Sequence, residues 1–193
     1  MGIRAENLAL LAALYYLVYL LTFRCYGTHL PGDQRGWKDR TRGEDRGGWR
    51  DPSADLESHV REAMLGEPYV LNEARAQLVL ESMQPVCAFR AWDLIAAHVR
   101  TTHVHCVVSG AMLPNHAVAD LKAYSSRTLN RIEGHHQRWA RGANARTLRT
   151  AEAIHAAIRY VADGQGEPMA VYVFNPTRQG GDSVDPSYTE SPP

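Results

Sequence analysis

The chain has 193 residues, enough for one hydrophobic core, and its length argues against two full domains. Lysine plus arginine equals aspartate plus glutamate at 21 each, so the overall charge does not indicate a polyanionic partner. Three cysteines without Cys-x-x-Cys spacing or a secretory pattern argue against a disulfide-bonded secreted protein, and we expect a cytoplasmic protein with these thiols in its core.

An uncharged apolar run from Leu8 to Phe23 is the candidate for a membrane segment. A spanning helix needs about 20 apolar residues, so we expect no membrane anchor, and a membrane-tethered protein is the alternative. The aromatic and aliphatic residues from Tyr15 to Phe23 instead predict a buried first strand, which follows a lead-in over residues 1–14.

The segment after this strand, residues 27–50, is dense in glycine, arginine and aspartate, and it predicts a long surface loop. Helical and strand patterns then alternate along the chain. The expected elements are a helix opened by Asn72 and bent or ended by Pro85, strands over 92–99 and 103–109, a helix from Pro114 to Gly134, a helix from Thr150 to Gly164, and a strand over 169–174.

The order of one strand, a helix, two adjacent strands and a second helix is typical of an α+β domain. We therefore expect one ferredoxin-like domain over residues 15–174, with an antiparallel sheet and helices packed on one face. The end of the chain, residues 175–193, is rich in proline, serine and aspartate and is expected to be a disordered tail.

A His-x-His pair is the first candidate for chemistry. His103 and His105 share one face of their predicted strand, while Val104 and Cys106 point to the other face. Two neutral imidazoles on one face can bind a divalent cation. The alternative is a pair of solvent-exposed or hydrogen-bonded histidines, because this spacing alone is not specific.

Tyr124 is the second candidate. It lies on the predicted helix after the histidine strand, at the border of the apolar stripe, so its phenol could reach over the sheet edge towards the histidines. The alternative is that its ring only packs against the core.

Four segments of the chain together resemble the single-tyrosine HUH transposases, especially the REP-associated tyrosine transposases. Thr102 to Val108 followed by Leu121 to Tyr124 resembles their HUH strand and tyrosine helix. The resemblance covers about Tyr15 to Tyr172. The other matching segments are Tyr26 to Asp33 with Arg35 to Trp37, after the first strand, and Ala157 to Val161 with Gly164 to Gly166, in the last helix.

The resemblance implies a transposase-like DNA endonuclease and strand transferase that serves DNA transposition and recombination. Mg²⁺ or Mn²⁺ would be bound by His103 and His105, and Tyr124 would cut single-stranded or hairpin DNA at repeat elements through a 5′-phosphotyrosine, without a nucleotide cofactor. Some relatives carry a glutamine one turn after the tyrosine as third ligand, and Thr128 stands there in this chain. Asp120, Thr128 and His116 are the candidates for the third ligand.

DNA contact is expected from a basic part of the chain that contains one aromatic residue, although a solvated polar face is the alternative. The residues are Lys122, Arg127, Arg131, Arg138, Trp139, Arg141, Arg146 and Arg149. Two other functions remain open: a domesticated protein that binds hairpin DNA without cutting it, and an unrelated metal-dependent hydrolase. The sequence does not decide between a monomer and a homodimer.

Overall fold

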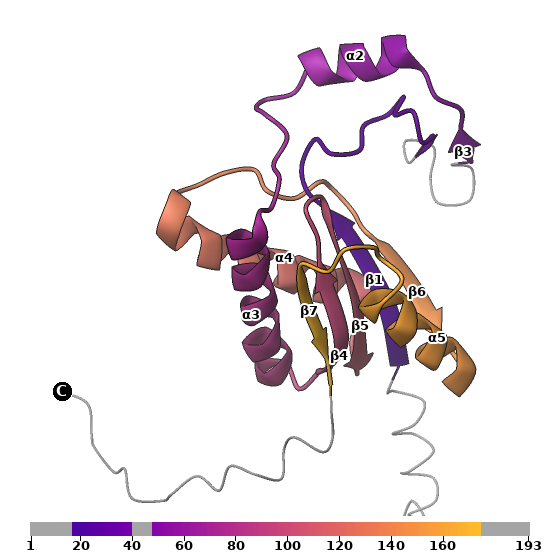
Figure 1. Cartoon of the computed structure of the whole chain (residues 1–193), viewed down its shortest axis with the longest axis vertical. Coiled ribbons are helices and arrows are strands. Elements are labelled where there is room, and N and C mark those ends of the chain that lie inside the picture. The colour runs from indigo at the N-terminus through magenta and orange to yellow at the C-terminus, as the bar shows by residue number, and fades with distance from the viewer. Residues whose placement is uncertain (1–16, 40–47, 175–193) are drawn as a thin grey trace, which may run out of the picture.

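The computed structural model describes residues 17–39 and 48–174 (Figure 1). The predicted lead-in over residues 1–14 and the predicted tail over residues 175–193 lie outside these ranges. Within them, no helix has the length and apolar character needed to cross a membrane.

The centre of the fold is a five-stranded sheet in the order β6-β1-β5-β4-β7, and every neighbouring pair of strands is antiparallel. Helix α3 connects β1 to β4, and α4 connects β5 to β6, which is the ferredoxin-like arrangement. The expected α+β fold is therefore confirmed. The elements are β1 (Leu17–Arg24), α3 (Glu73–Phe89), β4 (Asp93–Val99), β5 (His103–Gly110), α4 (Pro114–Glu133), β6 (Asn144–Leu148), α5 (Ala151–Ala162) and β7 (Ala170–Val173).

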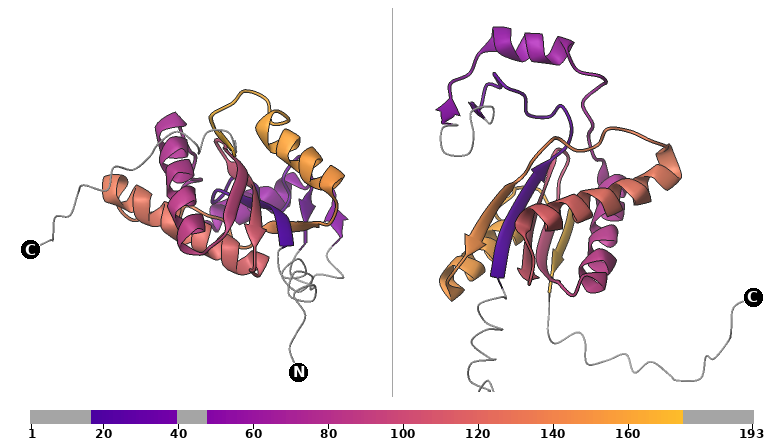
Figure 2. Two further views of the ribbon diagram at one scale, coloured as in Figure 1. Left: turned by 90° about the horizontal axis from the view of Figure 1, so that it is seen from below. Right: turned by 180° about the vertical axis from the view of Figure 1, so that it is seen from behind.

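Both faces of the sheet are covered, as Figure 2 shows, so the expectation that the helices pack on one face is wrong. Helices α3 and α4 pack on one face, where Val104, Cys106 and Val108 of β5 join the main core. Helix α5 packs on the other face, where Val107 of β5 and Val161 of α5 belong to a second, smaller apolar cluster. We call these surfaces the α3/α4 face and the α5 face. Because successive side chains of β5 point to opposite faces of the sheet, each of them lies either on the α3/α4 face or on the α5 face.

Helices α3, α4 and α5 begin where the sequence predicted. The side chain of Asn72 accepts a hydrogen bond from the Arg75 amide, Pro114 opens α4, and Thr150 accepts one from the Ala153 amide. The helix does not end at Pro85, because α3 continues to Phe89, and a bend at Pro85 stays a prediction. Buried residues on both sides of the exposed Pro85, among them Met83, Val86 and Cys87, hold the helix against the core.

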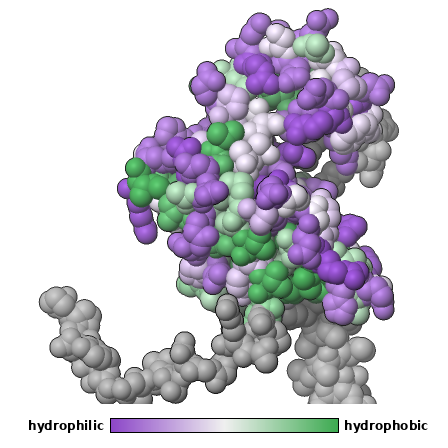
Figure 3. Space-filling view, in the orientation of Figure 1, coloured by the Kyte–Doolittle hydropathy of each residue, from purple (hydrophilic) through white to green (hydrophobic). Residues whose placement is uncertain are grey.

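The long connection from β1 to α3 contains more structure than the predicted loop. A two-stranded ribbon, β2 (Trp37–Lys38) and β3 (Trp49–Arg50), is followed by the helix α2 (Ala54–Glu62). These elements project from the sheet in Figure 1 and have a largely hydrophilic surface in Figure 3. Helix α2 has no buried residue, so no apolar stripe in the sequence could reveal it.

Candidate metal and tyrosine site

His103 and His105 lie next to each other on the α5 face. Their ring centroids are 4.7 Å apart, and the rings are almost perpendicular at 81°. A threonine hydroxyl hydrogen-bonds the Nδ1 atom of each ring: Thr102 Oγ1 lies 3.0 Å from His103, and Thr22 Oγ1 lies 2.8 Å from His105. These contacts orient both rings, and Nε2 has a free lone pair in the tautomer whose Nδ1 donates its proton to the threonine hydroxyl.

Both imidazoles are held in the neutral form. Burial lowers the pKa of His103 to about 4, and the positive charges of Arg24 and Arg100 act in the same direction. Burial also lowers the pKa of His105 to about 3, with a further contribution from neighbouring His103. A neutral imidazole has a free lone pair at neutral pH, which is the form that binds a divalent cation.

Tyr160, near the end of α5, is the tyrosine beside this pair. Its ring centroid lies 5.4 Å from that of His105 at an interplanar angle of 75°. The residue is 45% exposed, so a large substrate can reach it.

Gln165 lies in the loop after α5, and its side chain links Tyr160 to the histidines. Its amide nitrogen donates a hydrogen bond to the Tyr160 carbonyl over 3.2 Å, and the same side chain hydrogen-bonds His103. We call His103, His105, Tyr160 and Gln165 the histidine–tyrosine site.

Across residues 17–39 and 48–174, no three His, Cys, Asp or Glu side chains gather to hold a metal. Two imidazoles and the amide oxygen of Gln165 are donor types that a divalent cation can accept.

Tyr124 is not part of this site. It packs against the main core on the α3/α4 face, and the Arg127 guanidinium lies 4.9 Å from its ring centroid. The sheet separates it from His103 and His105, which point to the α5 face. The expectation that its phenol reaches the histidines is wrong, because α4 packs on the aliphatic side of the histidine strand.

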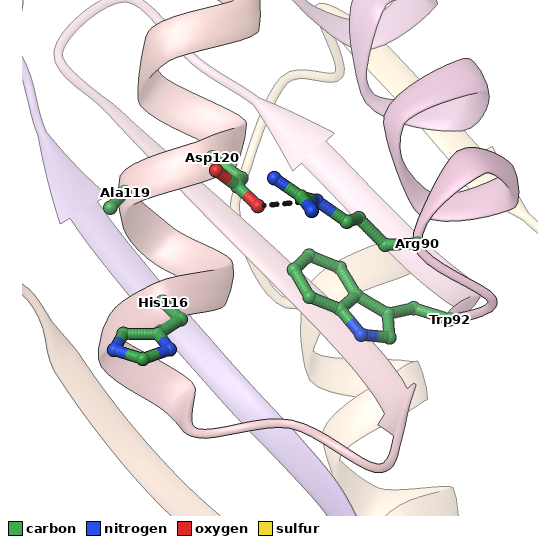
Figure 4. Close-up of a pocket in the computed structure, with 5 residues that line it drawn as sticks. All are labelled: Arg90, Trp92, His116, Ala119 and Asp120. Atoms are coloured by element: carbon green, nitrogen blue, oxygen red, sulfur yellow. Dashed lines mark ion pairs between the residues drawn. The ribbon is translucent and has the colours of Figure 1, made fainter.

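The three residues considered as third ligands also lie away from the histidine pair, because all three are on α4. They are His116, Asp120 and Thr128. Asp120 forms an ion pair with Arg90 Nε at 2.8 Å. His116, Asp120 and Arg90 line a cavity of about 280 Å³ together with Trp92 (Figure 4). Thr128, on the same helix, is one turn beyond Tyr124. The helix places none of the three beside the histidine pair.

Several of the residues expected to contact DNA stabilise the fold instead. Arg138 has a fully buried side chain, and its guanidinium donates to Glu133, Asn130 and the Gly134 carbonyl. The indole of Trp139 packs edge to face on Phe23, with centroids 5.0 Å apart, and donates to the Lys122 carbonyl. The ammonium group of Lys122 donates to the carbonyls of Ala140 and Gly142.

The other predicted cations are exposed but lie in different places. Arg127 and Arg131 are on α4, which covers the α3/α4 face. Arg141 and Arg149 flank β6 on either side. Arg146 is paired with Leu20 of β1, which packs against the second cluster, so Arg146 shares the α5 face with the histidine–tyrosine site.

Comparison with solved structures finds several chains that are distantly similar to this one. A solved structure of a REP-associated tyrosine transposase bound to a REP hairpin aligns with a TM-score of 0.43 and 11% sequence identity. The alignment covers 75% of this chain and 64% of that chain. No family model matches the sequence, and no curated protein matches it.

Sequence reasoning did not single out Tyr160 and Gln165, which the structure places beside the histidine pair. Both belong to the segments that resemble the last helix of the HUH transposases, Ala157 to Val161 and Gly164 to Gly166. The missing information was which sheet face each helix covers. A tyrosine on the helix that packs opposite to Val104 and Cys106 would have been the better choice.

Proposed function

We propose that this chain is a metal-dependent, transposase-like DNA endonuclease and strand transferase in which Tyr160, rather than Tyr124, is the nucleophile. The observation that supports this is the position of the Tyr160 phenol beside two neutral imidazoles on one sheet face, 5.4 Å from His105 between ring centroids. A partly exposed tyrosine beside a pair of metal-binding histidines provides the components needed for phosphodiester cleavage without a water nucleophile.

The metal-binding part of the proposal assigns three side chains. His103 and His105 would bind Mg²⁺ or Mn²⁺ through ring nitrogens, and Gln165 would supply an amide oxygen as the third ligand. When bound, the cation stabilises negative charge on the oxygens of the scissile phosphate as a Lewis acid. Thr22 and Thr102 keep the two rings oriented through their contacts with Nδ1.

The chemical step uses the phenol oxygen of Tyr160. This oxygen attacks the phosphorus and loses its proton, the bond from phosphorus to the 3′-oxygen breaks, and that oxygen takes up a proton. The products are a 5′-phosphotyrosine and a free 3′-hydroxyl. Attack by a 3′-hydroxyl reverses the step and rejoins strands, so the reaction needs no nucleotide cofactor.

The proposed substrate is single-stranded or hairpin DNA at repeat elements. The surface around the site favours a polyanion, because Arg24 and Arg100 are close enough to lower the pKa of both histidines. Arg146, exposed on the same face, provides a further phosphate contact.

The direct test is covalent capture of labelled hairpin DNA in the presence of Mn²⁺. Wild-type protein should form an adduct that survives denaturing electrophoresis, Tyr160→Phe should form none, and the matched Tyr124→Phe should form it normally. Loss of the adduct only in Tyr124→Phe would contradict the assignment. Hairpin binding without an adduct in any variant would instead indicate a DNA-binding protein that does not cut.

A further inference from the structure

His98 is a buried histidine that the proposed chemistry does not use. It lies in β4 with 0% exposure and pairs directly with His105 of β5. Directly opposite residues of an antiparallel pair share a sheet face, so His98 points to the α5 face behind the histidine–tyrosine site.

Both ring nitrogens of His98 are hydrogen-bonded. Nδ1 lies 3.0 Å from the Val161 carbonyl, which can only accept, so Nδ1 carries the proton. Nε2 accepts a hydrogen bond from the Met169 amide over 3.4 Å. One donor and one acceptor are what a neutral imidazole offers, and this leaves neither nitrogen for a metal.

The two contacts fall at the two ends of one loop. Val161 is in the last turn of α5, directly after Tyr160, and Met169 is the last residue before β7. The loop between α5 and β7, residues 163–169, carries Gln165. His98 of β4 therefore contacts both ends of the segment that directly follows Tyr160 and carries Gln165.

We infer that His98 is a positioning residue that holds Tyr160 and Gln165 over the His103–His105 pair by fastening both ends of the α5–β7 loop. This inference rests on the proposed function of the site. A side chain that only filled space would need no polar atoms, and a leucine would serve. Here an apolar replacement would leave a buried carbonyl and a backbone amide without their partner.

The test compares three variants by Mn²⁺ binding to the DNA-free protein. His98→Leu removes both hydrogen bonds at similar volume, and His98→Asn keeps a donor near the Nδ1 position. Val86→Ala is the matched control, since it removes fully buried bulk from the main core on the other sheet face. We expect His98→Leu to lower Mn²⁺ affinity by about tenfold or more, His98→Asn to retain most of it, and Val86→Ala to leave it unchanged.

Amide hydrogen exchange gives a second readout that needs no metal. His98→Leu should speed exchange in residues 160–169, while Val86→Ala should not do so selectively. Equal Mn²⁺ affinity and equal loop exchange in His98→Leu and Val86→Ala would overturn the inference. If wild-type protein binds no Mn²⁺, the proposed metal site fails, and loop exchange alone then decides whether His98 fastens the loop.

Discussion

Thr22 and His105 face each other across β1 and β5, and the threonine hydroxyl lies 2.8 Å from Nδ1 of the imidazole. Thr22 also pairs with Asn144 of β6, and His105 also pairs with His98 of β4. A row of polar side chains thus crosses four strands on the α5 face. Its position explains how a sheet rich in valine can hold the His105 ring in one orientation.

Replacing Thr22 with valine should weaken metal binding while the fold persists. Valine keeps the shape but removes the hydroxyl that orients His105, and loss of such a partner typically costs about 10- to 100-fold in metal affinity. Titration of Mn²⁺ into the DNA-free protein measures this. Thr147→Val, on exposed edge strand β6, is the control and should bind like wild type. Unchanged affinity in Thr22→Val would show that the hydroxyl has no such role.

Stability should fall as the pH drops below about 6.5. The pKa of His103 is lowered to about 4 and that of His105 to about 3, so the unfolded chain takes up protons before the folded protein does. Their contribution is complete above the ordinary histidine value and is lost as the pH falls towards these folded values. Urea unfolding of the metal-free protein at pH 7 to 4 measures it.

The double variant His103→Asn with His105→Asn provides the comparison for this pH dependence. It should unfold with uptake of about two fewer protons near pH 5 than wild type does. Identical pH dependence in the two proteins would mean that the folded protein does not hold these imidazoles neutral.

Arg138→Met should destabilise the fold without a specific effect on DNA binding. The substitution removes a fully buried guanidinium from Glu133 and Asn130, and breaking a buried ion pair in this way costs about 3 kcal/mol. Arg131→Ala, exposed on the same helix, should change the free energy of unfolding by less than about 0.5 kcal/mol. Normal stability with weakened hairpin binding in Arg138→Met would instead show that Arg138 contacts DNA, as the sequence predicted.

Arg146→Ala should weaken hairpin binding more than Arg131→Ala does. Arg146 is on the α5 face with the histidine–tyrosine site, whereas Arg131 is on α4 across the sheet. Loss of one phosphate contact should lower the slope of log affinity against log salt concentration by about 1. Fluorescence anisotropy at several salt concentrations measures both quantities. A larger effect of Arg131→Ala would place the DNA on the opposite side of the molecule.

The sequence predicted the central elements well because local signals mark them. Alternation along residues 103–109 gave the histidine strand, and Asn72, Pro114 and Thr150 gave the starts of three helices. Strand β6 was missed because most of its residues are exposed and it lies at a sheet edge, so no alternation of buried and exposed residues marks it.

The candidate site was predicted in part. The shared face of His103 and His105 follows from strand periodicity, and the structure places their rings together. The tyrosine beside the histidines lies on α5 and not on α4 as expected, because periodicity within α4 indicates which residues face a core but not which sheet face that core covers. Arg138 and Trp139 were misread for a related reason: cations and aromatic rings can stabilise buried structure as well as bind DNA.

The central claim, that Tyr160 becomes joined to DNA, is tested most directly by mass spectrometry of the trapped adduct after tryptic digestion. Cleavage after Arg159 and Arg178 releases residues 160–178, whereas Tyr124 lies in the peptide 123–127. We predict a nucleotide phosphate on the peptide 160–178, with fragmentation assigning it to Tyr160. A nucleotide on the peptide 123–127 would contradict this account of the site.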